Sequence, residues 1–446
     1  MSRKTPYDRC LEEMFQLRRF GIRLELATIR AILAALGHPQ RQYPAIHIAG
    51  SNGKGSTASM LTTILSRAGY KVGLYTSPHL IRFNERIKIN GREISDSRVA
   101  AAYKAVKDKH GRKRPPTFFE YTTAMAFYEF ARQKVDVAVI ETGMGGRYDA
   151  TNVLTPILSI ITNISLEHQA YLGKTLAAIA GEKAGIIKPR VPLITAVRQE
   201  SAIAVIRQTA KEKKADCFRL GEQFTVRRHR SGDFSYSGPA MKIKNLSTRL
   251  PGAHQTSNAA LAVAACEVLN SRGRLSIPEE SIRQGLLEVR WPARLEIVSN
   301  NPLVIIDGAH NLAGAGILSR YLSTSAELAG KKILLVIGIL DDKPYEAMLK
   351  KLVPLSDSVI LTRAKIGRAI EPQVLARIVR PMKRRFEIAG SVEEAVRQAV
   401  DKASPADAIC ISGSLYVAGE ARHALTKMGI IRGETPKAAS GEMFLI

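Results

Sequence analysis

The chain has 446 residues, of which 45% are hydrophobic, so it is long enough for two or three domains that each bury a core. It has no apolar run of the roughly 18 residues that a membrane span needs, and we expect neither a signal peptide nor contact with a membrane. The formal net charge of +26 favours anionic partners, either nucleic acid or small polyanions such as nucleotides and multi-carboxylate compounds.

The arrangement of the basic residues and cysteines indicates which partners and which cellular compartment to expect. Basic clusters are short, at residues 112–114, 227–230 and 383–385, and none is interleaved with aromatic residues as in an RNA-binding module. We therefore expect solvated surfaces and no nucleic-acid partner. The cysteines are far apart and lack disulfide or metal-ligand spacing, which is typical of free thiols in a reducing cytoplasm. They are Cys10, Cys217, Cys266 and Cys410.

The first part of the chain predicts helices followed by a strand and a glycine-rich turn. Residues 7–37 have the periodicity of two helices, and residues 43–48 are a short apolar strand. The stretch 47–57, HIAGSNGKGST, comes next and leads into a helical pattern over residues 57–67. A strand, a glycine-rich turn and a helix start together form the geometry that binds a phosphate group.

The residue types in this turn suit a nucleotide phosphate. Lys54 would reach the terminal phosphates, and the Ser56 hydroxyl could be placed on Mg²⁺. The turn is not a strict Walker A motif, because Ile48 occupies the place of the first glycine and Gly55 separates Lys54 from Ser56. A glycine-rich turn without a ligand is the alternative interpretation.

The pattern then alternates between strands and helices. Strands are predicted over residues 71–76, 135–142, 157–164 and 191–197, and the near-continuous apolar runs are typical of parallel strands buried on both faces. Residues 86–92 predict a hairpin with an Asn-Gly turn. Polar residues at the strand ends indicate a doubly wound α/β sheet of the P-loop type.

The remaining chain predicts an appendage and a second domain. Residues 216–250 have the short, polar strands of a small antiparallel appendage, and a helix is expected over residues 254–269. The strand–helix pattern restarts after residues 290–294. We therefore predict a phosphate-binding domain over residues 1–292 and a smaller Rossmann-like α/β domain over residues 293–446. The second domain's strands are expected at residues 303–306, 333–337, 359–362, 386–388 and 408–411.

Several polar residues follow predicted strands of the first domain. Glu141 ends one buried strand and His168 follows the next, and with Ser56 or Ser77 they could hold a divalent metal. A helix-capping glutamate and a hydrogen-bonded loop histidine remain as alternatives. The glycines of residues 143–146 indicate either close backbone approach to a ligand or a simple turn.

Two further positions have open interpretations. Lys183, late in a predicted helix, is by itself typical of a surface lysine or of a favourable charge at a helix C-terminus. Asp307 and His310 follow a strand of the second domain, where they could contact a ribose or a phosphate, or form a turn with an Asp or Asn cap.

Taken together, these motifs resemble the folylpolyglutamate synthase/dihydrofolate synthase family, within the ATP-dependent Mur-type amide ligases. The resemblance covers nearly the whole chain in the family's order. It rests on residues 49–57, 76–80 with 82–86, 119–120, 141–152, 167–168, 182–185, 254–255 with 258–260, 291–296 and 307–311. The ordered set is far more specific than any one motif.

The resemblance implies roles for individual residues. The ATP phosphates would be bound by Ser51, Asn52, Gly53, Lys54, Gly55 and Ser56, and the rest of ATP by Asn258, Arg294 and Asp307, with His310 nearby. Magnesium would be held by Ser77, Glu141, His168 and a carbamylated Lys183, whose CO₂ adduct is an extended carboxylate. The pterin substrate would lie near Phe119, Glu120, Tyr148, Asp149 and Ala150. Lys54, Lys183 and His168 would be the catalytic residues.

The implied reaction is ATP-dependent ligation of L-glutamate to a folate or dihydropteroate carboxylate through an acyl phosphate, by a monomer. Leu312-Ala313 stands where many members of the family have a proline, and residues 22–26 do not match the family's pterin-binding segment clearly. The choice between dihydropteroate and tetrahydrofolate polyglutamates therefore stays open. Another Mur-type amino-acid ligase and a basic nucleic-acid-binding ATPase are the alternative functions.

Overall fold

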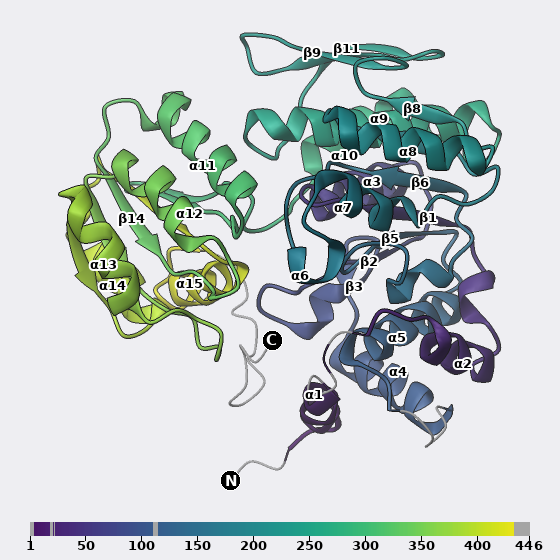
Figure 1. The fold of residues 1–446 in the computed structure, drawn as a ribbon, viewed down its shortest axis with the longest axis horizontal. Coiled ribbons are helices and arrows are strands. Elements are labelled where there is room, and N and C mark those ends of the chain that lie inside the picture. Colours follow the sequence, from purple (N-terminus) through teal and green to yellow (C-terminus); the bar gives the residue numbers. More distant parts are fainter. Residues whose placement is uncertain (1–3, 18–20, 22, 110–114, 432–446) are drawn as a thin grey trace. The chain divides into compact units, whose positions relative to one another are not determined.

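The computed structural model describes residues 4–17, 21, 23–109 and 115–431. Two compact units divide the chain. Of the described residues, those within 1–79, 83–249 and 253–290 form the first unit, and those within 80–82, 250–252 and 291–446 form the second. Figure 1 shows both as α/β structures, as the strand–helix alternation predicts.

A mixed eight-stranded sheet forms the centre of the first unit. Six of its strands run parallel, and β3 and β4 form an antiparallel hairpin at one edge. Every residue of β1 and β5 is buried, which explains their apolar sequences. In spatial order the strands are β4 (Arg92–Glu93), β3 (Ile87–Ile89), β2 (Val72–Tyr75), β5 (Val137–Glu141), β1 (Ala45–Ala49), β6 (Leu158–Ile161), β7 (Leu193–Thr195) and β8 (Cys217–Arg219).

Helices cover both faces of this sheet (Figure 1). They are α1 (Pro6–Gln16), α2 (Ala27–Ala35), α3 (Lys54–Arg67), α4 (Asp96–Lys109), α5 (Phe118–Gln133), α6 (Gln169–Leu172), α7 (Leu176–Ala184), α8 (Glu200–Glu212), α9 (Ala253–Ser271) and α10 (Glu279–Glu288), with short 3₁₀ turns η2 (Pro39–Arg41), η3 (Phe83–Arg86) and η4 (Ala150–Val153). Helix α3 packs against β2, β5, α9 and α10, whereas α5 packs against α2 and α4. The predicted Asn-Gly hairpin is confirmed, because Asn90 and Gly91 adopt the positive φ values of 48° and 74° that a tight turn requires.

A separate three-stranded antiparallel sheet lies against α9. It consists of β9 (Thr225–Arg228), β10 (Phe234–Ser237) and β11 (Lys242–Leu246). The predicted appendage therefore exists, but its predicted start at residue 216 is wrong. Residues Cys217–Arg219 form β8, which follows α8 and continues the parallel ladder beside β7, as a strand–helix–strand crossover does.

The second unit has a six-stranded sheet. All five predicted strands are confirmed and run parallel, and β12 was not predicted because its sequence, EIVSN, contains only two apolar residues. In spatial order the strands are β12 (Glu296–Asn300), β13 (Leu303–Ile306), β17 (Ala408–Ser412), β14 (Ile333–Ile337), β15 (Ser358–Leu361) and β16 (Arg385–Ile388). The helical segments are α11 (Leu312–Thr324), η5 (Ala326–Leu328), α12 (Tyr345–Leu352), η6 (Val353–Leu355), α13 (Pro372–Val379), η7 (Arg380–Met382), α14 (Val392–Lys402) and α15 (Leu415–Lys427).

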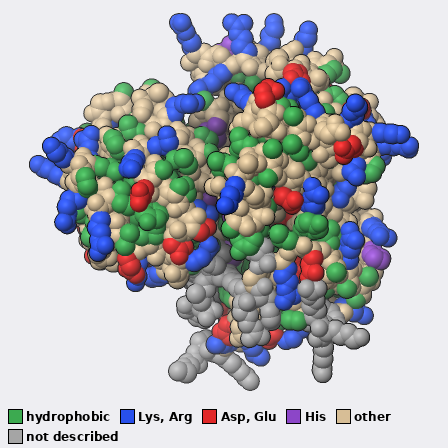
Figure 2. Space-filling model, viewed as in Figure 1, with side chains coloured by type: hydrophobic (Ala, Val, Ile, Leu, Met, Phe, Trp, Pro, Cys, Tyr) green, Lys and Arg blue, Asp and Glu red, His purple; other side chains and the backbone are tan. Residues whose placement is uncertain are grey.

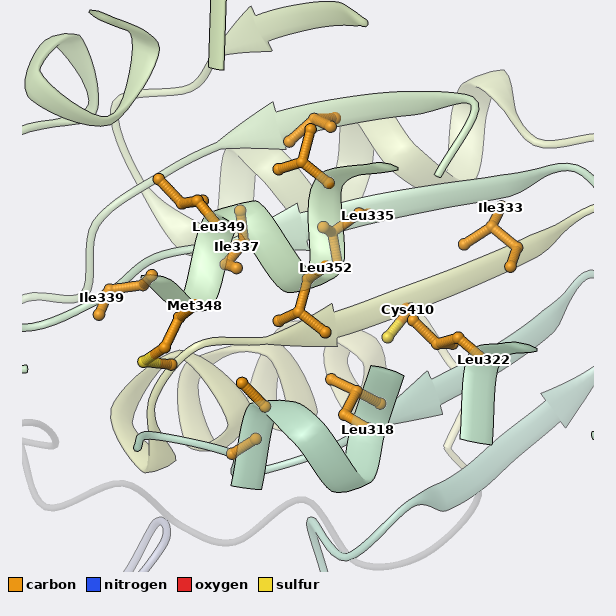
Figure 3. Close-up of a cluster of buried hydrophobic side chains, with 14 of the residues drawn as sticks. Leu318, Leu322, Ile333, Leu335, Ile337, Ile339, Met348, Leu349, Leu352 and Cys410 are labelled. Carbon is orange, nitrogen blue, oxygen red and sulfur yellow. The ribbon is translucent and has the colours of Figure 1, made fainter. Parts of the chain in front are cut away.

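The core of the second unit lies on both faces of its sheet. Along β14, Leu335 and Ile337 pack in the cluster formed with α11 and α12, which Figure 3 shows. The alternate residues Leu334 and Val336 pack on the other face with α14 and α15. Adjacent strand residues point to opposite faces, so one apolar strand supplies both layers. No helix among the described residues is long and apolar enough to cross a membrane.

Candidate active site

The predicted phosphate loop connects β1 to α3. Helix α3 begins at Lys54, directly after a loop in which Gly50 and Gly53 have φ values of 146° and 84°. A Cβ atom on Gly50 would lie 1.9 Å from Thr162 Oγ1, and one on Gly53 would lie 2.5 Å from Asn258 Oδ1. Both positions therefore require glycine on conformational and steric grounds.

The chain after β6 holds this loop in place. The backbone N–H groups of Ser51 and Asn52 donate to the backbone oxygen and the Oδ1 atom of Asn163, both over 2.9 Å. Thr162 Oγ1 donates to the Asn52 carbonyl over 2.7 Å, and Ser165 N–H donates to Ser51 Oγ over 3.0 Å. The N–H groups in the first turn of α3 have no intrahelical acceptor, so they are the donors that this loop can present to an anion.

Two lysines converge on one carbonyl at the end of β1. Lys54 Nζ and Lys183 Nζ each donate to the Gly50 carbonyl oxygen over 3.0 Å. Lys183, on α7, is 1% exposed and forms an ion pair with Glu167 Oε1 at 2.7 Å. Burial lowers the pKa of Lys183, and Glu167 opposes this shift. Burial raises the pKa of Glu167, but Lys183 and Lys54 outweigh it and hold that pKa at about 2.

Glu167 is the residue at this centre whose role the sequence did not indicate. The sequence assigned a metal-binding role to its neighbour His168, and the available signal for Glu167 was a carboxylate in the loop after a buried strand. In the structure His168 is exposed and precedes α6 with a φ value of 45°. The carboxylate beside Lys183 is that of Glu167, whose side chain is 9% exposed.

Glu141 and Ser77 meet at the ends of β5 and β2. Glu141, the last residue of β5, is 5% exposed, and its Oε2 atom accepts the Ser77 backbone N–H over 3.3 Å. In the part of the chain that the structure describes, no group of three or more His, Cys, Asp and Glu side chains is placed to hold a metal ion. The carboxylate and the hydroxyl-bearing residue nevertheless supply the hard oxygen donors that Mg²⁺ prefers.

Helix α9 reaches the start of α3 through two amide side chains. Gln255 Nε2 lies 3.5 Å from Ser56 Oγ, and Asn258 Nδ2 donates to Gln255 Oε1 over 2.8 Å. Ser56 and Asn258 are both buried. The structure thus brings the predicted nucleotide residue Asn258 against the phosphate loop. Gln255, which belongs to a motif of the resemblance but had no assigned role, connects Asn258 to Ser56.

The glycine-rich segment after β5 is organised by Asp149. Its Oδ2 atom accepts the N–H groups of Gly143 and Met144, each over 2.9 Å, and its Oδ1 atom accepts the Thr151 N–H over 3.0 Å. Burial raises the pKa of this carboxyl group. Asp149 therefore shapes its own loop. Of the two adjacent residues that were also predicted to lie near the pterin, Ala150 is buried and Tyr148 is 44% exposed.

The same segment is fixed to α7, the helix that carries Lys183. The Arg147 N–H donates to the Glu182 carbonyl over 2.7 Å. A Cβ atom on Gly146 would lie 2.8 Å from the carbonyl oxygens of Glu182 and Lys183. The segment that follows Glu141 and the helix of Lys183 are therefore packed together as one structure.

Phe119 and Glu120 lie in the first turn of α5. A Cβ atom on Gly143 would lie 2.6 Å from Phe119 Cζ, so the Phe119 ring packs on the glycine-rich segment. Glu120 Oε2 accepts the N–H and hydroxyl groups of Thr117 in a capping box, over 2.8 and 2.9 Å. Its Oε1 atom is buried with no hydrogen-bond partner among the described residues. One carboxylate oxygen therefore holds the start of α5, and the other makes no hydrogen bond among the described residues.

In the second unit, Asp307 and Arg294 meet at the end of β13. Asp307 accepts the N–H groups of Leu295 and Ala309, both over 2.9 Å. Burial raises the pKa of Asp307, and Arg294 opposes this shift. Arg294 Nη1 donates to its neighbouring carbonyl, that of Ala293, over 2.9 Å. His310 Nδ1 lies 2.8 Å from the Gly308 carbonyl oxygen, so Asp307 and His310 share the loop after β13. Arg294 precedes β12 and lies beside this loop, since a Cβ atom on Gly308 would be 2.7 Å from Arg294 Nη1.

Comparisons with known proteins agree with this geometry. The sequence matches the Mur ligase middle domain over residues 48–266 and the glutamate ligase domain of Mur ligases over residues 293–415. The dihydrofolate synthase/folylpolyglutamate synthase of Bacillus subtilis is 39% identical over 364 residues, which cover 79% of this chain and 84% of that protein. The folylpolyglutamate synthase of Lacticaseibacillus casei is 36% identical over 407 residues, covering 89% and 93%.

Solved structures show the same similarity. The structure of E. coli FolC in complex with DHPP and ADP has a TM-score of 0.87 and 30% identity, over 94% of this chain and 98% of that one. Mycobacterium tuberculosis folylpolyglutamate synthase complexed with ADP and AMPPCP has a TM-score of 0.86 and 33% identity, over 96% and 100%. The resemblance of the motifs is thereby confirmed, and this chain belongs to the folylpolyglutamate synthase/dihydrofolate synthase family of Mur-type ligases.

Proposed function

We propose that this protein uses ATP to join L-glutamate to the carboxylate of a folate or dihydropteroate substrate. The observation that carries the proposal is that Lys54 Nζ lies at the Gly50 carbonyl, beside the N-terminus of α3. An ammonium group and a helix N-terminus suit the phosphates of a nucleotide. The relatives named above support glutamate ligation.

In this proposal the phosphate loop binds ATP. The N–H groups of residues 54–56 hold the phosphate oxygens, and Lys54 moves from the Gly50 carbonyl to the transferring phosphoryl group. That group passes to the acceptor carboxylate, giving an acyl phosphate and ADP. The glutamate amine then attacks the acyl carbon and releases phosphate, which leaves an amide. Lys54 thus offsets the charge that develops during phosphoryl transfer.

Magnesium fits the oxygen donors next to this loop. Glu141 and Ser77 adjoin each other, and we propose that they hold Mg²⁺ together with His168 and a carbamylated Lys183. Carbamylation adds CO₂ to the neutral amine with loss of one proton and converts an ammonium, which repels a cation, into an anionic oxygen ligand. The ion would neutralise phosphate charge.

The other predicted residues complete the proposed substrate sites. Asn258 lies next to Gly53 and would contact the nucleotide. Arg294, Asp307 and His310 would contribute further nucleotide contacts. Phe119, Glu120 and the loop of residues 148–150 would bind the pterin, and the free Oε1 atom of Glu120 supplies an acceptor for a ring N–H group. We propose that the enzyme acts as a monomer in the cytoplasm.

The test is ADP release with Mg-ATP, L-glutamate and bicarbonate, comparing dihydropteroate with tetrahydrofolate as acceptor. Turnover with dihydropteroate alone identifies a dihydrofolate synthase, and turnover with tetrahydrofolate alone a polyglutamylating enzyme. Turnover with both identifies a bifunctional enzyme. Omission of glutamate controls for simple ATP hydrolysis. Folded protein that turns over neither acceptor would refute the folate assignment.

A further inference from the structure

The three-stranded sheet β9–β10–β11 has one face that the proposed ligation does not use. Its inner face is apolar, since Phe234, Tyr236, Ile243 and Leu246 are at most 2% exposed. Side chains alternate between the two faces of a strand, so the residues between these apolar positions form the outer face. We call the six side chains on that face the outer sheet surface. They are Thr225, Arg227, Ser235, Ser237, Lys242 and Lys244.

Strand register arranges the outer sheet surface in two rows. Thr225, Ser237 and Lys242 pair across the three strands. Arg227 pairs with Ser235, and Lys244 lies on β11 beside this pair, where the register shifts. The rows are about 7 Å apart along the strands, and the flanking strands are about 10 Å apart. A hydroxyl group of β10 therefore lies between cationic or hydroxyl side chains in each row.

More cations surround this surface, and acidic partners do not neutralise them. Arg228, Arg230 and Arg249 are exposed at the ends and edge of the sheet. Within the described part of the chain, none of these three arginines, nor Arg227, Lys242 or Lys244, forms an ion pair. Figure 2 shows Lys and Arg side chains projecting at the top of the view, where Figure 1 places β9 and β11.

We propose that the outer sheet surface binds the phosphate backbone of double-helical nucleic acid without reading its sequence. Arg, Lys and Ser/Thr side chains are the groups that contact phosphates in such complexes. Both aromatic side chains of β10 point inward, and the His229 ring beside the surface is half-buried and held by Ser235 Oγ at 2.8 Å. Strands β9 to β11 therefore present no exposed Phe, Tyr or Trp ring on which the bases of a single strand could stack. This proposal replaces the sequence-based expectation of no nucleic-acid partner, which the local charge clusters alone suggested.

A lipid surface is the less favoured partner. The large hydrophobic side chains that are exposed in the described chain all lie outside residues 217–252, so this sheet has none to insert into a bilayer. Arg227 on the surface and the three arginines around it also match phosphate oxygens, because a guanidinium group offers two parallel N–H donors. The arrangement therefore favours directed phosphate contacts over diffuse attraction to a membrane.

The test is fluorescence anisotropy with a labelled 20-base-pair duplex, as DNA and as RNA, between 50 and 200 mM salt. Neutralising about four phosphates predicts an affinity loss of roughly 100-fold over this range. The variant R227Q/K242Q/K244Q is expected to reduce the slope of log affinity against log salt by about 2.7. The control K350Q/K351Q/R377Q removes three exposed cations of the second unit and is expected to leave the slope unchanged.

Three results would overturn the proposal. They are absence of duplex binding by the native protein at 50 mM salt, equal loss of affinity in both triple variants, and binding to vesicles of phosphatidylcholine and phosphatidylserine without binding to the duplex. Equal circular-dichroism melting curves establish that the variants fold. Glutamate ligation is measured in parallel and should not change, because none of the altered residues belongs to the proposed active site.

Discussion

Replacing Gly50 with alanine tests whether the phosphate loop depends on its close approach to β6. The new Cβ atom would lie 1.9 Å from Thr162 Oγ1, and the backbone φ value of 146° is unfavourable for alanine. The conformation costs about 1–3 kcal/mol, and overpacking in a buried site adds about 1–3 kcal/mol. We expect the free energy of unfolding to fall by about 2–6 kcal/mol.

Gly69→Ala is the matched control. Gly69 also has a positive φ, 92°, but a Cβ atom there would meet nothing within 4 Å. This variant should therefore lose only the conformational part, about 1–2 kcal/mol. Urea unfolding at one pH and temperature compares the two variants. The Gly50 variant should also bind ADP more weakly, because displacing Thr162 removes its hydrogen bond to the Asn52 carbonyl.

A double variant identifies the contact that causes the loss. Adding Thr162→Ala to Gly50→Ala removes the atom in the clash, so the two changes should together destabilise the protein less than the sum of their separate effects. Strict additivity would show that Thr162 is not the cause. Equal stability losses in the Gly50 and Gly69 variants would refute the steric argument itself.

Three other predictions concern catalysis, acceptor binding and pH. Lys54→Met should lower kcat by about 100-fold or more, because it removes a positive charge from the site of phosphoryl transfer. Steady-state ADP release measures kcat, and an unchanged value would contradict the proposed role of Lys54. Gly143→Ala would place a Cβ atom 2.6 Å from Phe119 Cζ and should raise KM for the pterin acceptor more than for ATP, whereas Gly316→Ala, in open space, should change neither. Burial raises the pKa of Glu420 from 4.5 to about 7, so between these pH values the folded state holds a proton on Glu420 that the unfolded state has lost. The free energy of unfolding should therefore fall by about 3 kcal/mol as pH rises from 4.5 to 7. The difference in unfolding free energy between the native protein and Glu420→Gln should show this slope, and parallel pH profiles of the two proteins would exclude the effect.

The sequence predicted the elements whose signals are local. The apolar runs of β5 and β6 identified buried parallel strands, and the Asn90-Gly91 pair identified the hairpin turn. The phosphate loop was found because its glycines and Lys54 are consecutive in the chain. Strand β8 was assigned to the wrong sheet, and strand β12 was not predicted. Each depends on pairing with a neighbouring strand for its structure more than on its own apolar residues.

The contacts that shape the candidate site could not be predicted, because they join distant segments. The Lys183–Glu167 ion pair and the hydrogen bond from Lys183 to Gly50 join α7, the loop after β6 and the end of β1. From the residues alone, Lys183 was more typical of a surface lysine, and only the family resemblance placed it in the site. Burial of its amine is a property of the tertiary structure.

Topology explains why the phosphate site lies at the end of β1. Strand β1 lies between β5 and β6, all three run parallel, and their carboxyl ends therefore reach the same edge of the sheet. The chain leaves β1 for β2, beyond β5, whereas β5 continues to β6 on the other side of β1. The connections diverge at this point and leave room outside the strand ends. Gly50, Glu141 and Asn163 then follow from three strands at one edge, which is why a loop, a carboxylate and an anchoring amide that are distant in sequence lie together at the candidate site.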